Sequence, residues 1–423
     1  MRRALAAGAL AALAWTAPAA AAPYVVTLRD DTADVAATVD ALQKSVGFAS
    51  KLRYDAALKG FSADLSGGQA TKLRADPSVA SVVDDAPVTA AGSAVPVAAG
   101  DVVPPGIRRV GAATATVAHG ASGAGVAILD TGIDLANADL SVAPGVNCVT
   151  TGAVPKDDNG HGTNVAGILG ARDDGRGVVG VAPGTRLYAV KVLNKSASGT
   201  LSQLLCGINW VAANAAALNI RVANMSVAGA GASDGSCGAS NNDAEHKAIC
   251  AATAAGVTFV AAAGNNTKGF AATIPAAYPE VLTVAAMTDT DGRPGALGPV
   301  AGCRKGEKDD TLASYSNYPV TAADQAHALA APGTCVLSDK MGGGTSTYYG
   351  TSQAAPHVAG TVALCLDDAG VAGPCAGLPP DQVIQRVRAD ASGAGTLANG
   401  FAGDPLRPLG GRTGGWLVHA EVY

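Results

Sequence analysis

The sequence predicts an α/β protein, a three-layer sandwich around a mostly parallel β-sheet, with a small α+β domain in front of it. From Gly106 onward, short apolar segments typical of buried strands alternate with helical segments, which indicates a parallel sheet covered by helices on both faces. Residues 23–90 show the order βαββαβ, which is typical of a ferredoxin-like domain. A nearly uncharged segment rich in Ala, Val, Gly and Pro separates the two.

The N-terminus has the order of features found in a secretory signal peptide. Met1, Arg2 and Arg3 precede an apolar stretch over residues 4–15, and small residues follow up to Ala22. This order predicts a signal peptide over residues 1–22, and therefore secretion to the periplasm or to the outside of the cell. A buried N-terminal helix is the alternative.

The small domain over residues 23–90 is built from strands and two helices. A Thr residue at position 32 is the expected cap of the first helix. The strands are expected at residues 24–28, 61–65 and 79–83, and the helices at residues 32–46 and 69–74. Residues 91–105 have neither helical nor strand periodicity, and we expect an exposed linker there that holds a processing site.

The large domain over residues 106–423 carries the predicted parallel sheet. Buried strands are expected at residues 126–129, 222–225, 257–261 and 281–285. One helix is expected after His161, and a second over residues 201–218 with Thr200 or Ser202 as its cap. Because ligands bind at the carboxyl ends of parallel strands, we expect the functional side chains there.

The chain has eight cysteines, all beyond residue 147. An even number behind a signal peptide predicts disulfides formed outside the cytoplasm. We predict the short-range pairs Cys237 with Cys250 and Cys365 with Cys375, while the other pairings stay open. A zinc site is the competing interpretation, but the sequence has no CxxC pair and no HExxH helix.

Composition restricts the partners of this 423-residue chain. The net charge is −5 and no basic segment is interleaved with aromatic residues, so we expect no nucleic-acid partner. No segment after the N-terminus is long and apolar enough to cross a bilayer, so we expect no membrane partner. The expected partner is a protein or peptide, and the chain is expected to be a monomer.

Three side chains are candidates for nucleophilic catalysis. Asp130 directly follows the predicted strand at residues 126–129, where an Asp also often caps a turn. His161 lies between two glycines at the start of an apolar helix, and its unperturbed pKa suits a general base. Ser352 lies at the start of another helix, either as an ordinary N-cap or as a nucleophile close to free backbone donors.

The sequences around these residues resemble a known family. Asp130-Thr-Gly, His161-Gly-Thr and Gly350-Thr-Ser-Gln-Ala-Ala-Pro-His-Val-Ala-Gly together resemble the subtilisin-like serine peptidases, the subtilases. The order Asp, His, Ser also agrees with that family and differs from those of chymotrypsin-like peptidases and α/β-hydrolases. The resemblance implies a catalytic triad of Asp130, His161 and Ser352, in which Ser352 forms an acyl-enzyme.

The resemblance also implies an oxyanion hole and a substrate-binding strand. Asn265 is the expected oxyanion donor, although Gly264-Asn265 after a strand also suits an ordinary turn. The implied substrate-binding residues are Ser226, Val227, Ala228, Gly229, Ala262, Ala263 and Gly264. Two departures affect the pocket rather than the chemistry: many relatives have Leu-Gly-Gly where this chain has Val227-Ala228-Gly229, and Met where it has Gln353.

The N-terminal unit resembles the inhibitor-like propeptide of the same family, which implies that it assists folding and then blocks the cleft. The residues that carry this resemblance are Tyr54, Leu58, Gly60, Phe61, Ala63, Leu65, Asp76, Pro77 and Val79. No cofactor is expected for the chemistry. Relatives often bind structural calcium, whose ligands the sequence does not assign; Ala328 stands where some of them have an acid.

The sequence therefore predicts a secreted serine endopeptidase that processes itself from a proenzyme. A catalytically silent, peptide-binding member of the same fold is the alternative, because Ala228 and Gln353 depart from the family pattern. A lipase or esterase of the α/β-hydrolase type is a third hypothesis, but it requires a GxSxG motif, and position 354 is Ala.

Overall fold

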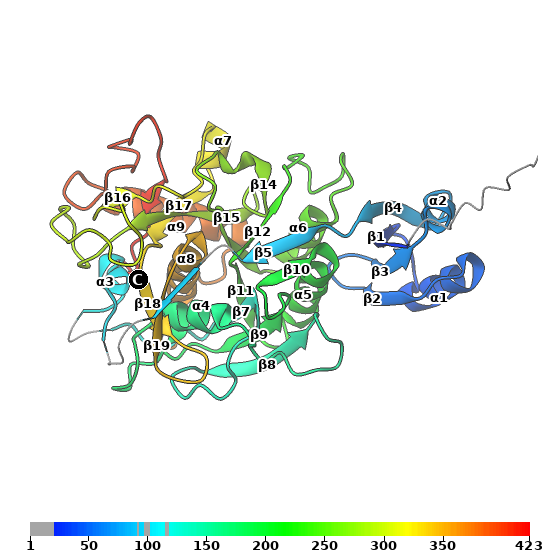
Figure 1. Ribbon diagram of the computed structural model, residues 1–423, viewed down its shortest axis with the longest axis horizontal. Coiled ribbons are helices and arrows are strands. Elements are labelled where there is room, and N and C mark those ends of the chain that lie inside the picture. Colours follow the sequence, from blue (N-terminus) through cyan, green and yellow to red (C-terminus); the bar gives the residue numbers. More distant parts are fainter. Residues whose placement is uncertain (1–20, 91–92, 97–101, 115–117) are drawn as a thin grey trace, which may run out of the picture.

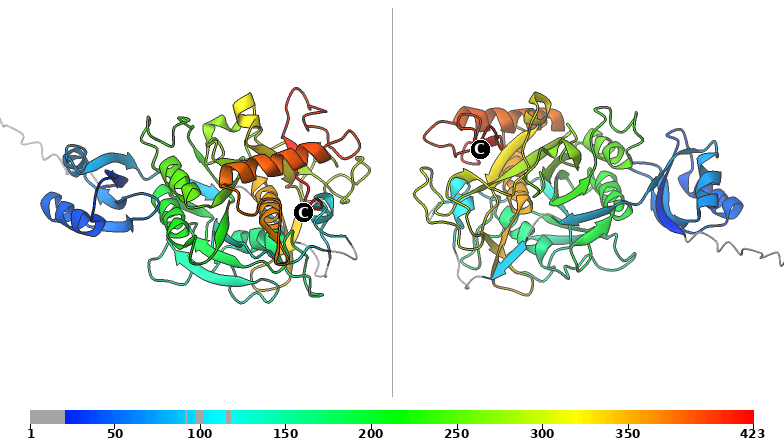
Figure 2. Two further views of the ribbon diagram at one scale, coloured as in Figure 1. Left: turned by 180° about the vertical axis from the view of Figure 1, so that it is seen from behind. Right: turned by 45° about the horizontal axis from the view of Figure 1, so that its top comes forward.

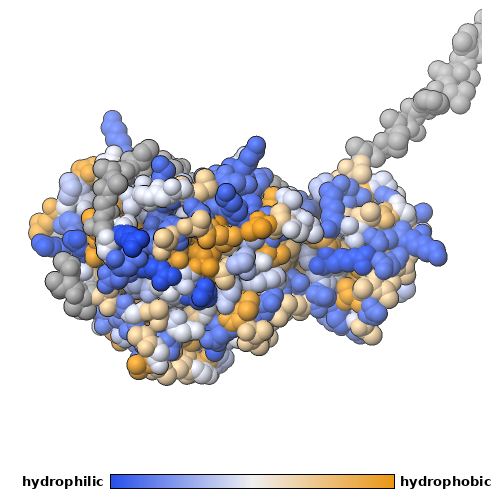
Figure 3. All heavy atoms as spheres, turned by 90° about the horizontal axis from the view of Figure 1, so that it is seen from below, coloured by the Kyte–Doolittle hydropathy of each residue, from blue (hydrophilic) through white to orange (hydrophobic). Residues whose placement is uncertain are grey.

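The computed structural model describes residues 21–90, 93–96, 102–114 and 118–423. The predicted signal peptide lies almost entirely outside these residues. The described chain forms a small N-terminal unit beside a larger domain (Figure 1), and in Figure 3 the small unit is a separate lobe with a mainly hydrophilic surface. Over the residues described, no helix has both the length and the apolar character required to cross a bilayer.

The small unit is a four-stranded antiparallel sheet with two helices on one face. Its strand order is β2-β3-β1-β4, which confirms the predicted βαββαβ order. The elements are β1 (Ala22–Leu28), α1 (Val35–Val46), β2 (Ser50–Tyr54), β3 (Gly60–Leu65), α2 (Gly67–Arg74) and β4 (Val79–Asp84). The predicted cap of the first helix is wrong: Asp34 is the N-cap, because its carboxylate accepts a hydrogen bond from the Ala37 N–H (2.9 Å).

The large domain is built on a nine-stranded sheet. Its strand order is β22-β17-β15-β13-β11-β7-β9-β8, and every neighbouring pair in this path is parallel. The strands are β7 (Gly125–Asp130), β8 (Val142–Asn147), β9 (Leu187–Lys191), β11 (Ile220–Met225), β13 (Thr258–Ala262), β15 (Val281–Thr288), β17 (Ala328–Pro332) and β22 (Trp416–Leu417), with the antiparallel β16 (Thr311–Leu312) beside β15. All four predicted strands correspond to strands of this sheet, although β13 begins at Thr258 and not at residue 257.

Helices cover both faces of this sheet, as predicted, and make three layers (Figures 1 and 2). Alternate residues of β7 show the two faces: Val126 and Ile128 pack with one set of helices, and Ala127 and Leu129 with the other. The first set is α4 (His161–Gly170), α8 (Thr351–Leu366) and α9 (Pro380–Ala394), and the second is α5 (Leu201–Asn214) and α6 (Ala244–Ala254). Short helices α3 (Pro105–Arg109), α7 (Ala322–Gln325) and η1 (Phe270–Ala272) lie in loops.

Helix α5 differs from its prediction at one end. Thr200 is its cap, since the Thr200 side chain accepts from the Gln203 N–H and the Gln203 side chain accepts from the Thr200 N–H. The helix ends at Asn214 rather than at residue 218. The chain turns there so that it can enter β11, whose first residue, Ile220, donates to the Ala215 carbonyl (2.9 Å).

Part of the predicted linker forms a strand. Residues 93–96 form β6 (Ser93–Pro96), which pairs antiparallel with β19 (Thr345–Tyr349), so the interpretation of residues 91–105 as a linker without strand structure is wrong there. The pairing satisfies backbone groups that a free linker exposes to water. The remaining small strands are β5 (Pro87–Ala90), β10 (Ser198–Thr200), β12 (Val227–Ala230), β14 (Thr273–Ile274), β18 (Val336–Asp339), β20 (Asp367–Asp368) and β21 (Val371–Ala372).

Four disulfides use all eight cysteines. They join Cys148 to Cys206, Cys237 to Cys250, Cys303 to Cys335 and Cys365 to Cys375. Both predicted pairs are confirmed.

Candidate active site

Two of the three candidate catalytic side chains are directly bonded. Asp130 is the last residue of β7 and His161 is the first residue of α4. The His161 Nδ1 atom lies 2.7 Å from Asp130 Oδ1, and both side chains are almost completely buried. Because Nδ1 donates its hydrogen to the carboxylate, Nε2 is the ring atom that can accept a proton. This nitrogen is buried and has no hydrogen-bond partner among the described residues.

The loop before His161 is organised by Asp157, a buried carboxylate that the sequence analysis missed. Asp157 accepts hydrogen bonds from the Thr131 hydroxyl (2.8 Å), from the Gly160 N–H (3.0 Å) and from the Thr163 N–H (3.0 Å). It therefore links the residue after Asp130 to the first turn of α4. The acidic run just before Asn159-Gly160-His161 is the sequence signal that indicates this role.

The electrostatics favour a protonated His161. Burial opposes the charge on the imidazole, but the charge of Asp130, its hydrogen bond and the charge of Asp157 outweigh burial and raise the pKa of His161. An imidazolium in this site is therefore stabilised, which is the state that a general base reaches after it takes a proton.

Ser352 lies in the first turn of α8 and is fully buried. Its hydroxyl donates to the Ser226 carbonyl oxygen (3.0 Å), and the Ser226 hydroxyl donates to the Ser352 carbonyl oxygen (2.8 Å). Helix α8 packs against α4, and Gln353 donates to Asn164, one turn after His161 (3.4 Å). The structure therefore brings the N-terminal turns of the two helices together, and Gln353 supports that contact.

Asn265, the candidate oxyanion donor, is held by Thr351. Its Oδ1 atom accepts from the Thr351 N–H (2.9 Å) and from the Thr351 hydroxyl (3.0 Å). The Thr351 hydroxyl also accepts from the Gly264 N–H (3.0 Å). With Oδ1 used in this way, the Nδ2 group is the end of Asn265 that can donate to a ligand. Gly264 has φ +99°, and an added Cβ would lie 2.5 Å from the Asn317 Nδ2 atom, so glycine is required there.

The predicted substrate strand has a partner. Strand β5 lies between β10 and β12, with Thr89 opposite Ser198 on one side and opposite Ala228 on the other. Ala90 lies opposite Val227, and Gly229 pairs with Ile274 of β14. The other predicted pocket residues are placed differently: Ala262 and Ala263 are fully buried. Strand β10 is not predicted from the sequence, where its signal is the short polar, Gly-containing run before the Thr200 cap.

The small unit contacts the large domain at the start and middle of α5. The Asn209 Oδ1 atom accepts from three consecutive N–H groups, those of Asp55 (3.2 Å), Ala56 (2.7 Å) and Ala57 (3.0 Å). Asp85 accepts from the Ser202 N–H at the helix N-terminus, which favours a negative charge. The buried Tyr54 hydroxyl donates to the Ser202 carbonyl oxygen (3.2 Å).

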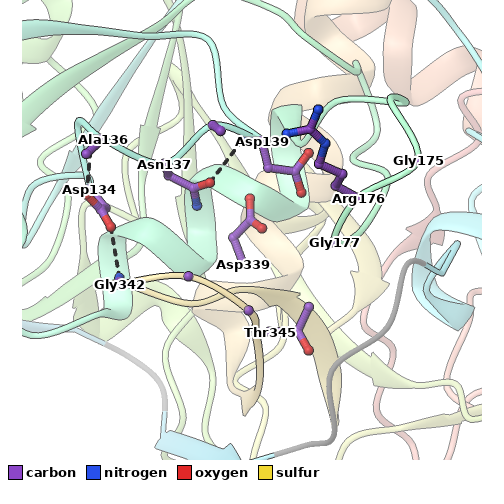
Figure 4. Close-up of a pocket in the computed structure, with 13 residues that line it drawn as sticks. Asp134, Ala136, Asn137, Asp139, Gly175, Arg176, Gly177, Asp339, Gly342 and Thr345 are labelled. Carbon is purple, nitrogen blue, oxygen red and sulfur yellow. Dashed lines mark hydrogen bonds between the residues drawn. The ribbon is translucent and has the colours of Figure 1, made fainter.

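One oxygen-lined pocket suits a hard cation. The cavity of about 510 Å³ is lined by Asp134, Asn137, Asp139, Asp339 and a Gly-rich loop. Figure 4 shows the carboxylates of Asp139 and Asp339 pointing toward one another. Burial raises the pKa of both groups, that of Asp339 to about 8 with the charge of Asp139 adding to the effect. The Asp339 Oδ2 atom is buried without a hydrogen-bond partner among the described residues, so this donor set fits calcium.

Comparisons with known proteins show which families and relatives the chain is similar to. Residues 121–398 match the family described as "Subtilase family", and residues 23–91 match "Peptidase inhibitor I9". Alkaline elastase YaB of Bacillus sp. (strain YaB) is 37% identical over 294 residues, which cover 69% of this chain and 65% of the relative. Subtilisin DY of Bacillus licheniformis is 37% identical over 258 residues, which cover 59% of this chain and 79% of the relative.

Among solved structures, the chain is similar to one titled "Crystal structure of a cold adapted subtilisin-like serine proteinase". The sequence identity is 30% and the TM-score is 0.49. The match covers 66% of this chain and 86% of that one.

Proposed function

Because the chain belongs to the subtilase family of serine endopeptidases, we propose that it is secreted as a proenzyme, cleaves its own N-terminal unit away and then hydrolyses proteins through an acyl-enzyme on Ser352. Four disulfides support secretion, because such bonds persist in oxidising compartments. A relative of 37% identity is named "Minor extracellular protease Epr".

In the proposed reaction, the Ser352 hydroxyl attacks the carbonyl carbon of the scissile peptide. His161 Nε2 takes the hydroxyl proton, and Asp130 stabilises the imidazolium that forms. The oxyanion receives hydrogen bonds from Asn265 Nδ2 and the Ser352 N–H; one such donor is worth about 10² to 10³ in kcat. His161 then gives its proton to the leaving amine, and a water molecule releases the acyl group by the reverse sequence.

The observation that carries this proposal is the position of two strands, β5 and β6, on either side of Ser352. On one side, β5 lies as an added strand against β12, and it ends with Ala90 opposite Val227. On the other side, β6 begins with Ser93 opposite Tyr349, two residues before Thr351. The residue before Val227 is Ser226, whose carbonyl accepts the Ser352 hydroxyl, so β5 ends beside the nucleophile. We therefore propose that the proenzyme cleaves its own chain between Ala90 and Ser93.

Intact mass of the secreted chain tests this proposal. We expect wild type to lose the segment that begins at residue 23 and ends between Ala90 and Ser93, and to react with a serine-directed fluorophosphonate. The Ser352→Ala variant should keep these residues and stay unlabelled, whereas Ser392→Ala, at an exposed serine of α9, should behave as wild type. Processing by folded Ser352→Ala to the same product would contradict the assignment of Ser352.

The catalytically silent alternative rests on Ala228 and Gln353, and both residues have ordinary places in the structure. Ala228 pairs with Thr89 through its backbone, and Gln353 bonds Asn164. Hydrolysis of casein by purified wild type, set beside Ser352→Ala, distinguishes an active enzyme from a peptide-binding protein. If wild type reacts with the fluorophosphonate but does not hydrolyse casein, its activity is limited to cleavage of its own chain.

We also propose that the pocket of Asp139 and Asp339 holds a structural calcium ion. The cation would neutralise two buried carboxylates that otherwise share one proton, and it takes no part in the acyl transfer. Support comes from the oxygen-only donors and from the unpartnered Asp339 Oδ2.

A further inference from the structure

A second group of carboxylates lies in the loop over residues 289–310, between β15 and β16. Asp289, Asp291 and Asp309 each offer one carboxylate oxygen, and these three atoms all lie within 4.8 Å of one another. Asp289 and Asp309 are buried, and Asp291 is half-buried. None of them lines the pocket of Asp139 and Asp339.

The positively charged side chain of Arg109 lies beside this group, but its hydrogen bonds go to a fourth carboxylate, that of Asp310. Arg109 donates to Asp310 Oδ1 from Nε (3.0 Å) and from a terminal nitrogen (2.9 Å), and it also donates to two backbone carbonyls. Its Nε atom is 3.7 Å from Asp289 Oδ1, too far for a hydrogen bond. The guanidinium therefore lies close to two carboxylates, those of Asp289 and Asp310, and its hydrogen bonds to carboxylates go to Asp310.

The Asp289 Oδ1 atom points to a missing ligand. The side chain of Asp289 is fully buried, and its Oδ2 atom accepts from the Gly292 N–H (3.1 Å). Its Oδ1 atom has no hydrogen-bond partner among the described residues. An ionised carboxylate oxygen buried in this way is costly unless a cation or donor satisfies it.

We propose that Asp289, Asp291 and Asp309 bind a divalent, oxygen-preferring cation of the calcium class. Carboxylate oxygens are the ligands that calcium prefers, and the group has no imidazole or thiolate that would favour zinc. Asp309 is oriented for this role, because its two oxygens accept from the Thr290 N–H (2.8 Å) and the Gly298 N–H (2.8 Å). The cation joins the end of β15 to both ends of the loop.

Binding at this site also affects the surroundings of Ser352. The same loop carries Cys303, which is bonded to Cys335, and Arg304, whose guanidinium lies 4.7 Å from the ring centres of both Tyr315 and Tyr349. Tyr349 pairs with β6 beside the proposed cleavage point. A cation that fixes the loop therefore also fixes Tyr349 and strand β19, which lie on one side of Ser352.

Calcium titration of the full-length Ser352→Ala chain tests the site without self-digestion, so its result does not depend on peptidase activity. After removal of metal with EDTA, calcium binding is followed by calorimetry and by the melting temperature. The Asp291→Asn variant should lose one bound calcium equivalent or bind it about tenfold to a hundredfold more weakly, since a carboxylate charge beside a divalent ion is removed. The control Asp381→Asn, at an exposed position of α9, should bind as the parent does.

Two further variants keep the outcome decisive. Asp339→Asn removes a carboxylate of the other pocket. This variant should therefore still bind the calcium equivalent that Asp291→Asn loses. Asp289→Asn removes a buried charge, so it should melt in EDTA no lower than the parent and yet show a smaller calcium-induced rise. The proposal is overturned if Asp291→Asn and Asp289→Asn both keep the parent's calcium stoichiometry and melting-temperature rise.

Discussion

The contact between Asn209 and the N-terminal unit gives a prediction about the release of the propeptide. A single atom, Asn209 Oδ1, accepts hydrogen bonds from the N–H groups of Asp55, Ala56 and Ala57. Asn209→Ala removes all three bonds and leaves the core of either unit unchanged. We therefore expect the cleaved propeptide to bind the processed enzyme more weakly.

The magnitude follows from the exposure of these groups. The bonds of Asp55 and Ala56 are exposed, so water can replace them after the substitution, whereas Ala57 is buried and its bond is partly shielded. Taken at the lower end of the usual range, about 0.5 kcal/mol each, the three bonds together contribute at least about 1.5 kcal/mol. The dissociation constant of the propeptide should therefore rise at least about tenfold.

A dilution series of the autoprocessed complex measures this constant. Dilution frees enzyme from its propeptide, and brief fluorophosphonate labelling measures the fraction of free enzyme. The concentration at which half of the enzyme is labelled, the half-point, gives the dissociation constant. Asn214→Ala is the matched control, since Asn214 lies on the same helix and its side chain donates only within it, to the Trp210 carbonyl (2.8 Å). A half-point for Asn209→Ala within twofold of the control would refute the proposed contribution of these bonds.

Three further predictions concern the site and the core. Because the pKa of His161 is raised, the rise of kcat/KM with pH should be centred above the usual range of a free histidine; Asp130→Asn should move that rise to lower pH and lower kcat by about 10⁴ in a pH–rate profile. Gly264→Ala should displace Asn265 and reduce kcat by about 10² with little change in KM, measured on a peptide substrate. Burial, with the charge of Asp243, raises the pKa of Glu245 to about 8, so the folded state holds a proton that the unfolded state has lost. The unfolding free energy of the Ser352→Ala chain should therefore fall as pH rises from about 4.5 to about 8, and added Glu245→Gln should make that fall smaller in urea denaturation.

The elements predicted well from sequence are those whose signal is local. The central strands are continuous apolar runs because both of their faces are buried, and Thr200 with Gln203 makes a capping box within one turn. Strand β7 therefore places Asp130 at its carboxyl end as predicted. The end of α5 was placed too late because residues 215–218 keep an apolar, helix-forming composition although the chain already turns there.

The missed features depend on partners far away in the sequence. Strands β5, β6 and β10 contain three or four residues each, too few for a periodic pattern, and they form only because distant backbone groups pair with them. The pocket of Asp139 and Asp339 joins two residues about two hundred positions apart, and neither has a distinctive neighbourhood. Such sites follow from the order of the strands in the sheet, which single-residue patterns do not contain.

The strands on either side of Ser352 imply that one cleavage does not open the groove. Strand β5 is continuous with the N-terminal unit, which is held at Asn209 and Ser202, so it leaves only when that unit leaves. With the proposed cleavage between β5 and β6, β6 belongs to the other product, which is also held where Val102 bridges to Val178. Its four backbone pairs with β19 are independent of the Asn209 contact. Cleavage, departure of the N-terminal unit and release of β6 from β19 are therefore separate steps, and the part of the groove beyond the scissile bond opens to a protein substrate only after the last of them.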